Sequence, residues 1–135
     1  MKKHWIEYRE KWMASPISYW VHREKDSQYW REATKFDPPL PRPIPGEGYS
    51  YYYVEIDGFT FGFASFAEID HCITILSQKL LPTTLSLREA RDTTLLNRHW
   101  LSRLPGKVKS WKYRQKAVKY LSLARQEFAR ELNKY

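Results

Sequence analysis

The fold of this 135-residue chain is decided by residues 51–64, which read YYYVEI-DG-FTFGFA. Two runs of aromatic and β-branched residues flank Asp57-Gly58, a pattern typical of a β-hairpin closed by a two-residue type I′ turn. Such a turn fixes the register of the strands. Three apolar pairs then share one face: Ile56 with Phe59, Val54 with Phe61 and Tyr52 with Phe63. Helices must pack on that face, because a lone hairpin is marginally stable in water.

The opposite face of the predicted hairpin carries Tyr51 and Tyr53 beside Gly62 and Ala64. Two interpretations are open. The tyrosines either cover the cross-strand glycine and support the sheet, or they form a shallow aromatic platform on which the bases of single strands or RNA stack. We favour the first interpretation and keep Tyr51 and Tyr53 as candidate base-stacking residues.

Two helices are predicted before the hairpin, over residues 1–36. Trp5, Tyr8 and Trp12 recur at helical spacing and predict the first of them. Ser15-Pro16 is typical of a helix start, so a second helix is expected from there to about Phe36. Residues 37–48 are too rich in proline for a helix or strand and predict a stiff connector. A ligand for a proline-recognising module is the less favoured interpretation of this segment.

Residues 65–135, after the hairpin at 49–64, are predicted to be helical. The capping boxes Ser65-Phe-Ala-Glu68 and Ser86-Leu-Arg-Glu89 each open a helix, and Pro105-Gly106 is a turn. The last helix is expected from near Ser110 almost to Tyr135. The sequence therefore predicts one α+β domain over residues 1–135. It comprises an N-terminal helix pair, one β-hairpin and then two or three C-terminal helices packed on the hairpin.

The composition excludes several classes of protein. The chain carries 23 Lys and Arg against 15 Asp and Glu, a net charge of +8. No apolar stretch approaches the roughly 18 residues of a transmembrane helix, and charged residues follow Lys2-Lys3 where a signal peptide would be apolar. With Cys72 as the only cysteine, neither an internal disulfide nor a cysteine-based zinc site is expected. We expect a cytoplasmic protein with no cofactor, no metal and no membrane association.

The densest group of candidate catalytic side chains is Glu68, Asp70, His71 and Cys72. Cys72 falls on the apolar side of its predicted helix, whereas Asp70 and His71 project to the other side. No nucleophile is therefore expected beside a base, and the sequence favours a protein that is not an enzyme. The alternative, an enzyme that uses His71 or His99, requires a pocket that brings one of them beside a carboxylate.

The strongest functional signal is a basic segment near the C-terminus. Residues 91–135 hold twelve bases and three acids, and no acid lies between Arg98 and Lys119. The predicted last helix gathers lysines opposite its apolar side, which suits the phosphates of a nucleic acid. The candidate phosphate-binding residues are Arg98, Arg103, Lys107, Lys109, Lys112, Lys116 and Lys119. Trp111 and Tyr113 are further candidates for base stacking. The alternative is a lysine face that is merely solvated.

Two functions are compatible with these features. The leading hypothesis is a small, non-catalytic protein that binds DNA or RNA through the phosphate backbone, as a subunit or modulator of a nucleoprotein complex. The alternative is a protein–protein interaction module, an inhibitor or adaptor that binds an acidic protein or a nucleoprotein complex through aromatic surface, hairpin edge and basic face. Exposed tryptophans would favour this alternative. An uncovered hairpin edge also allows a homodimer.

Overall fold

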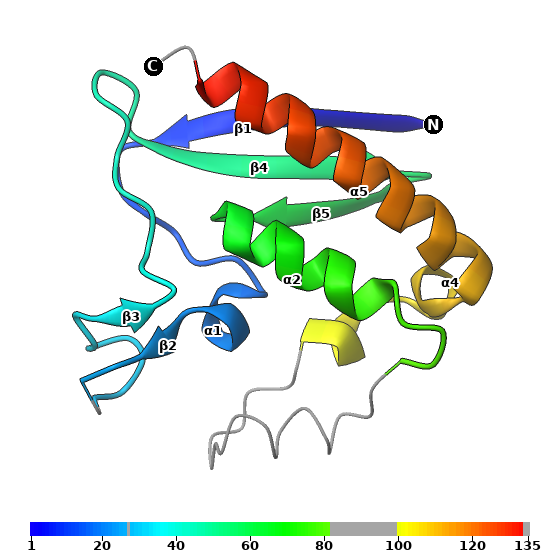
Figure 1. Cartoon of the computed structure of the whole chain (residues 1–135), viewed down its shortest axis with the longest axis horizontal. Helices are drawn as coiled ribbons and strands as arrows, with labels where there is room; N and C mark the ends of the chain where they lie inside the picture. Colours follow the sequence, from blue (N-terminus) through cyan, green and yellow to red (C-terminus); the bar gives the residue numbers. More distant parts are fainter. Residues whose placement is uncertain (27, 82–99, 134–135) are drawn as a thin grey trace.

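The structure is a computed structural model that describes residues 1–26, 28–81 and 100–133 (Figure 1). Its centre is a three-stranded antiparallel sheet in the order β1-β4-β5, and a second sheet pairs β2 with β3. The strands are β1 (Lys2–Arg9), β2 (Arg23–Glu24), β3 (Phe36–Asp37), β4 (Tyr49–Ile56) and β5 (Phe59–Phe63). The helical elements are α1 (Ser18–Val21), α2 (Phe66–Leu76), the 3-10 helix η1 (Trp100–Arg103), α4 (Gly106–Lys109) and α5 (Trp111–Leu132).

The predicted hairpin is confirmed as β4 and β5. Asp57 and Gly58 form its turn with φ values of 49° and 88°, the left-handed backbone that a type I′ turn requires at both central residues. The register also agrees with the prediction, since Ile56 pairs with Phe59 and Tyr52 with Phe63. The local sequence was sufficient here because the turn type alone sets which residues face each other.

The predicted fold class is wrong at the N-terminus, where the described residues form no helix pair. The expected first helix is strand β1, which pairs antiparallel with β4 and places Trp5 opposite Tyr53 and Ile6 opposite Tyr52. The sheet therefore has three strands instead of a single hairpin. Trp, Ile and Tyr favour a pleated surface, and the open edge of β4 supplies backbone partners along the whole of β1. The hydrogen bonds between β1 and β4 stabilise the strand more than the spacing of three aromatic residues favours a helix.

The expected second helix is reduced to the single turn of α1, followed by β2 and β3. The chain leaves the helical conformation at His22, whose φ and ψ are −88° and 96°. The indole of Trp30 donates a 2.6 Å hydrogen bond to the His22 carbonyl oxygen. This carbonyl oxygen therefore accepts a hydrogen bond from a side chain instead of from a helical amide. The side chain of His22 is fully buried. Tertiary contacts of His22 thus end the helix early.

Helices α2 and α5 lie side by side on one face of the main sheet (Figure 1). Val54, Ile56 and Phe63 point from the sheet into the layer between them, and all three are fully buried. The helices contribute the other buried residues of this layer, among them Ile69, Cys72, Leu76, Leu121 and Phe128. The prediction that helices cover the apolar face of the hairpin is confirmed. None of the described helices is long and apolar enough to span a membrane.

The two main helices begin where their capping residues predicted. The hydroxyl of Ser65 accepts a 3.2 Å hydrogen bond from the Glu68 amide, and that of Ser110 accepts one of the same length from the Tyr113 amide. Helix α2 ends at Leu76. The Pro105-Gly106 turn leads directly into α4. The helix expected from the capping box at Ser86 lies outside the described residues.

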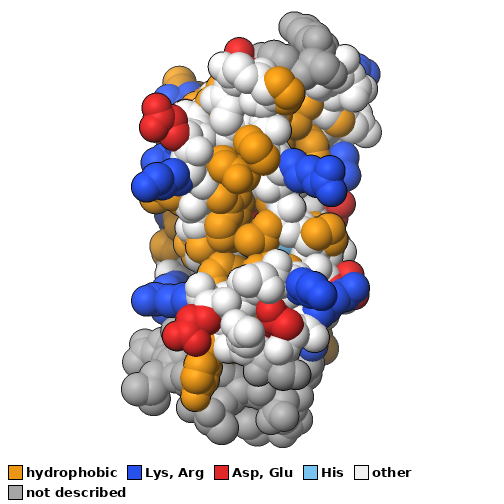
Figure 2. All heavy atoms as spheres, turned by 90° about the vertical axis from the view of Figure 1, so that its left-hand side faces the viewer, with side chains coloured by type: hydrophobic (Ala, Val, Ile, Leu, Met, Phe, Trp, Pro, Cys, Tyr) orange, Lys and Arg blue, Asp and Glu red, His pale blue; other side chains and the backbone are white. Residues whose placement is uncertain are grey.

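The proline-rich connector is irregular over residues 38–48 apart from a bridge between Ile44 and Gly48. On the side of the molecule that carries β3 and the connector, hydrophobic side chains form a band with Lys and Arg at both margins (Figure 2). Gly48 ends the connector at φ +100°. A Cβ atom built on it would lie 2.4 Å from the carbonyl oxygen of Arg9. The connector therefore approaches the end of β1 so closely that only glycine fits.

We expect Gly48→Ala to lower the free energy of unfolding by about 2–3 kcal/mol, because it adds both backbone strain and a steric clash. The measurement is urea unfolding followed by tryptophan fluorescence. Gly46→Ala is the matched control, since Gly46 has φ +81° but a Cβ atom added to it would meet no heavy atom within 4 Å. It should cost only about 1 kcal/mol. Equal losses in the two variants would show that the contact with Arg9 is unimportant.

Candidate nucleic-acid interface

The lysines predicted to bind phosphate lie on α4 and on the outer side of α5. Lys107, Lys112, Lys116 and Lys119 are exposed, and Lys109 is half-buried. The lysines of α5 recur at spacings of three and four residues, which places them along one side of the helix. The opposite side of α5 packs into the core.

The N-terminus adds positive charge that the sequence analysis did not place here. The N-terminus, the hairpin turn and the first half of α5 lie at the same end of the molecule (Figure 1). The amino group of Met1 lies 2.8 Å from Asp57 Oδ1, and the ammonium of Lys116 pairs with Asp57 Oδ2. The ammonium of Lys2 lies 5.9 Å from the centre of the Tyr120 ring on α5. We define the basic face as Lys2, Lys107, Lys109, Lys112, Lys116 and Lys119.

Asp57 is an acid next to this basic face, but its charge is balanced. The hydrogen bond from Lys116, followed by that from the N-terminal amine, lowers the pKa of Asp57 to about 2. The carboxylate is therefore ionised at neutral pH and pairs with two cations. Asp57 and its two partners together keep one positive charge, so Asp57 does not reverse the sign of the local potential.

Two residues of the basic segment are structural. The hydroxyl of Tyr113 donates a 2.8 Å hydrogen bond to the Ile56 carbonyl oxygen, and the residue is buried. Its ring is therefore not accessible to a bound base. Arg114 is also buried, and its guanidinium donates to backbone carbonyls after the end of α2. This role could not be read from the sequence because a helix-end carbonyl carries no residue-type signal.

The other candidates are placed differently. Trp111 is 36% exposed, with the Arg114 guanidinium 5.0 Å from its ring centre, and part of the ring remains accessible. Arg103 is exposed at the end of η1. Arg98 lies outside the described residues. The structure thus groups the lysines of α4 and α5 with Lys2. Arg103 lies before them in the chain, at the end of η1.

Tyr51 and Tyr53 lie on the outer face of the sheet, away from the helices. Their ring centres are 5.0 Å apart, and Tyr53 stacks on Trp5 at 5.3 Å. Arg9 lies 5.3 Å from the Tyr51 ring and donates a 2.9 Å hydrogen bond to the Tyr53 hydroxyl. A Cβ on Gly62 would lie 3.1 Å from a ring carbon of Tyr51. Neighbouring side chains thus occupy much of both rings, which supports their interpretation as a cover for the sheet.

An aromatic cleft of about 420 Å³ is lined by residues 14–16, by α1, by residues 29–32 and by Arg103 at the end of η1. Its aromatic lining consists of Tyr19, Trp20, Tyr29 and Trp30. Its charged lining consists of Arg31, Glu32 and Arg103. Sequence reasoning missed this cleft because it expected Tyr19, Tyr29 and Trp30 along one long helix, where they would not converge.

Sequence reasoning also missed a buried polar cluster around Glu68. His22 Nε2 lies 3.1 Å from Glu68 Oε2 and 2.9 Å from Ser65 Oγ, and both His22 and Glu68 are fully buried. Ser18 donates a 2.9 Å hydrogen bond to the same carboxylate, and Ser15 donates to its other oxygen. These partners lie up to 53 residues apart in the sequence. The sequence singled out Glu68 in a capping box and beside Asp70, His71 and Cys72, but neither pattern predicted its contacts with His22 and Ser18.

The pKa of His22 is raised in spite of its burial. Burial by itself lowers this pKa, but the hydrogen bond to Glu68, the Pro38 carbonyl and the charge of Glu68 together outweigh it. A serine, a histidine and a carboxylate in contact are the residue types of a catalytic triad. Here, however, His22 and Glu68 have no exposed surface, so no substrate reaches them in this arrangement. The cluster is better explained as a link between the N-terminal segment and α2.

The remaining catalytic candidates are also held in packing contacts. His71 Nε2 accepts a 3.1 Å hydrogen bond from the Trp100 indole, and burial lowers the pKa of His71 to about 4. Cys72 is fully buried, and burial raises the pKa of its thiol. His99 lies outside the described residues. Within residues 1–26, 28–81 and 100–133, no group of three or more His, Cys, Asp or Glu side chains is arranged to hold a metal ion.

The two features of the described residues that could bind a ligand are thus the basic face and the aromatic cleft. Comparison with known proteins adds no functional assignment: no protein-family model, curated protein or solved structure matches this chain.

Proposed function

We propose that this protein binds nucleic acid through the phosphate backbone, with the basic face as the contact surface. The main support is the convergence of six lysines from β1, α4 and α5, three elements that meet at one end of the molecule (Figure 1). Phosphate contacts of this kind need no base readout, and long lysine side chains reach them from an exposed helix.

The expected mode of binding is electrostatic and independent of sequence. Every phosphate that a lysine neutralises releases condensed counterions, so affinity falls steeply as salt rises. Lys112, Lys116 and Lys119 carry most of this effect because they project from the same side of one rigid helix. Lys2, Lys107 and Lys109 extend the contact on either side.

The triple variant Lys112→Gln/Lys116→Gln/Lys119→Gln should bind labelled DNA or RNA at least about tenfold more weakly near physiological salt. The slope of log affinity against log salt should become shallower by about one for each lysine that contacts a phosphate. Fluorescence anisotropy over a salt series measures both quantities. Single-stranded DNA, duplex DNA and RNA are compared in the same series.

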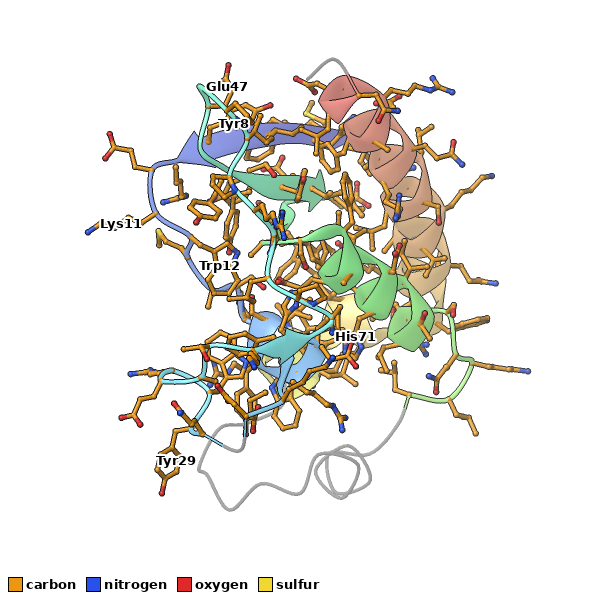
Figure 3. The ribbon with its side chains drawn as sticks, turned by 60° about the vertical axis from the view of Figure 1, so that its left-hand side comes forward. Tyr8, Lys11, Trp12, Tyr29, Glu47 and His71 are labelled. Carbon is orange, nitrogen blue, oxygen red and sulfur yellow. The ribbon has the colours of Figure 1, made fainter. Side chains whose placement is uncertain are left out.

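The matched control is Lys11→Gln/Lys35→Gln/Arg42→Gln, which removes the same charge from exposed residues on the side of β3 and the connector. Figure 3 shows Lys11 on the side of the molecule away from α5. This control should bind nearly as well as the unaltered protein. Equal losses in both triple variants, or no binding even at low salt, would contradict the proposal.

Binding of an acidic protein is the alternative proposal for the same face. It has less support, since Trp20 is buried and the other three tryptophans before residue 36 are half-buried: Trp5, Trp12 and Trp30. A homodimer through a hairpin edge would have to use β5, because β1 occupies the outer edge of β4.

A further inference from the structure

The aromatic cleft has the shape and chemistry of a ligand site. Its volume of about 420 Å³ lies in the range typical of small-molecule sites, about 300–1,000 Å³. Tyr29 is the most exposed aromatic ring of its lining, at 72%. Figure 3 shows Tyr29 projecting outward at the end of the molecule opposite the sheet. Tyr29 therefore stands at the rim of the cleft, with its ring exposed to solvent.

The interior of the cleft is a fixed aromatic framework. Trp30 packs edge-on against Tyr19 with ring centres 6.3 Å apart and against Phe36 at 5.5 Å. Its indole nitrogen is bonded to the His22 carbonyl oxygen. The rings are thus held in place before any ligand arrives, which reduces the entropy lost on binding.

Positive charge marks the kind of ligand that this framework suits. Arg31, Arg103 and Glu32 line the cleft, so cations outnumber the acid among its described residues. Flat rings together with arginine favour a ligand that combines a π face with negative charge. A nucleotide has both.

The cleft is also continuous with the basic face along the chain. Arg103 lines the cleft and also a neighbouring cavity of about 190 Å³ that includes Pro16. Four residues later, α4 presents Lys107, and α5 follows with Lys112. Arg103 is thus the cation of the cleft that lies nearest to the basic face in the sequence.

We propose that the aromatic cleft binds an unpaired base of a single-stranded nucleic acid whose phosphates lie on Arg103 and the basic face. This inference rests on the proposed function and names its substrate class. Bases inside a duplex are stacked and paired, so they do not reach an aromatic cleft without being extruded. Single strands expose their bases and stack them readily on aromatic side chains.

The test compares a labelled single-stranded oligonucleotide with the duplex of the same sequence, by anisotropy at one salt concentration. The unaltered protein should bind the single strand more tightly. Tyr29→Ala should weaken single-strand binding about tenfold, the usual scale for one lost stacking contact, and leave duplex binding unchanged. Tyr29→Phe keeps the ring and should retain the preference. Circular dichroism checks folding, and Tyr29 contributes only its backbone carbonyl to the hydrogen bonds with Glu32 and Ala33.

Two further variants separate this inference from the proposed function. Arg103→Gln should also reduce single-strand binding, whereas Leu123→Ala, at an exposed position of α5 outside the cleft and the basic face, should not. The inference is overturned if Tyr29→Ala has no effect, if duplex and single strand bind equally, or if Leu123→Ala removes the preference instead. In each of these cases a loss in the α5 lysine variant would still support the proposed function. Absence of binding to every nucleic acid would overturn both.

Discussion

Replacing Glu68 with alanine is expected to lower the free energy of unfolding by about 3–5 kcal/mol, the usual cost of removing one partner from a buried ion pair. The carboxylate accepts hydrogen bonds from Ser15, Ser18 and the Ala64 amide, and it lies beside His22. Without it, these buried donors lose their acceptor. Such a loss is a large fraction of the typical stability of a small domain, about 5–15 kcal/mol. Urea unfolding measures it.

Glu127→Gln is the matched control for this prediction. Glu127 also pairs with a histidine, His4, but its side chain is 44% exposed. An exposed pair contributes about 0–1 kcal/mol, so this variant should stay close to the unaltered protein. If Glu68→Ala costs no more than Glu127→Gln, the buried cluster does not stabilise the fold.

The pH dependence of unfolding is a second test of the role of Glu68. The variant for this test is Glu68→Gln, which removes the charge and keeps the shape of the side chain. The pKa of folded His22 is raised above its ordinary value of 6.5. Its contribution to stability is therefore present below pH 6.5 and is lost as the pH rises through the raised pKa. The difference in stability between the unaltered protein and Glu68→Gln should thus be larger near pH 6 than at high pH. The charge of Glu68 also raises the pKa of His71 against the effect of burial, so Glu68→Gln lowers the pKa of His71 further, which adds to the difference in stability at low pH.

The second large effect is expected at Arg114, which binds the chain after α2 to the start of α5. Its guanidinium donates to the carbonyl oxygens of Leu76 at 3.3 Å, Lys79 at 3.0 Å and Lys109 at 2.8 Å, and also to that of Gln78. A cation at a helix C-terminus is favourable because it meets the negative end of the helix dipole. Arg114→Met should cost about 3–4 kcal/mol, since one buried and three partly buried carbonyls lose a charged donor at once.

Arg114→Lys and Arg130→Met are the controls. Lysine keeps the charge but not the planar fork, so it should recover only part of the loss. Arg130 is exposed on α5, and its replacement should stay within about 0.5 kcal/mol. Urea unfolding at one pH gives the free energies of unfolding of the three variants for comparison. Equal stability of Arg114→Met and Arg130→Met would show that the guanidinium does not stabilise the end of α2.

Parts of the candidate interface were predictable because they depend on residues close together in the sequence. The lysine spacing on α5 follows from helix geometry, and Ser110 marked where that helix begins. Arg114 belongs to the same basic segment and was indistinguishable from its neighbours by residue type. Lys2 joins the basic face only because β1 pairs with β4 and brings the N-terminus to the hairpin turn.

The sequence by itself determined the hairpin, its register and the helices that begin at Ser65 and Ser110, because a two-residue turn and a helix cap are set by neighbouring residues. Only the tertiary structure decided that residues 2–9 form a strand, that His22 meets Glu68 and that Tyr29 and Arg103 line one cleft. The physical reason is the same in each case. A free strand edge, a buried charge and a cleft are completed by partners far away in the chain, and their energies outweigh the weak local preferences of single residues.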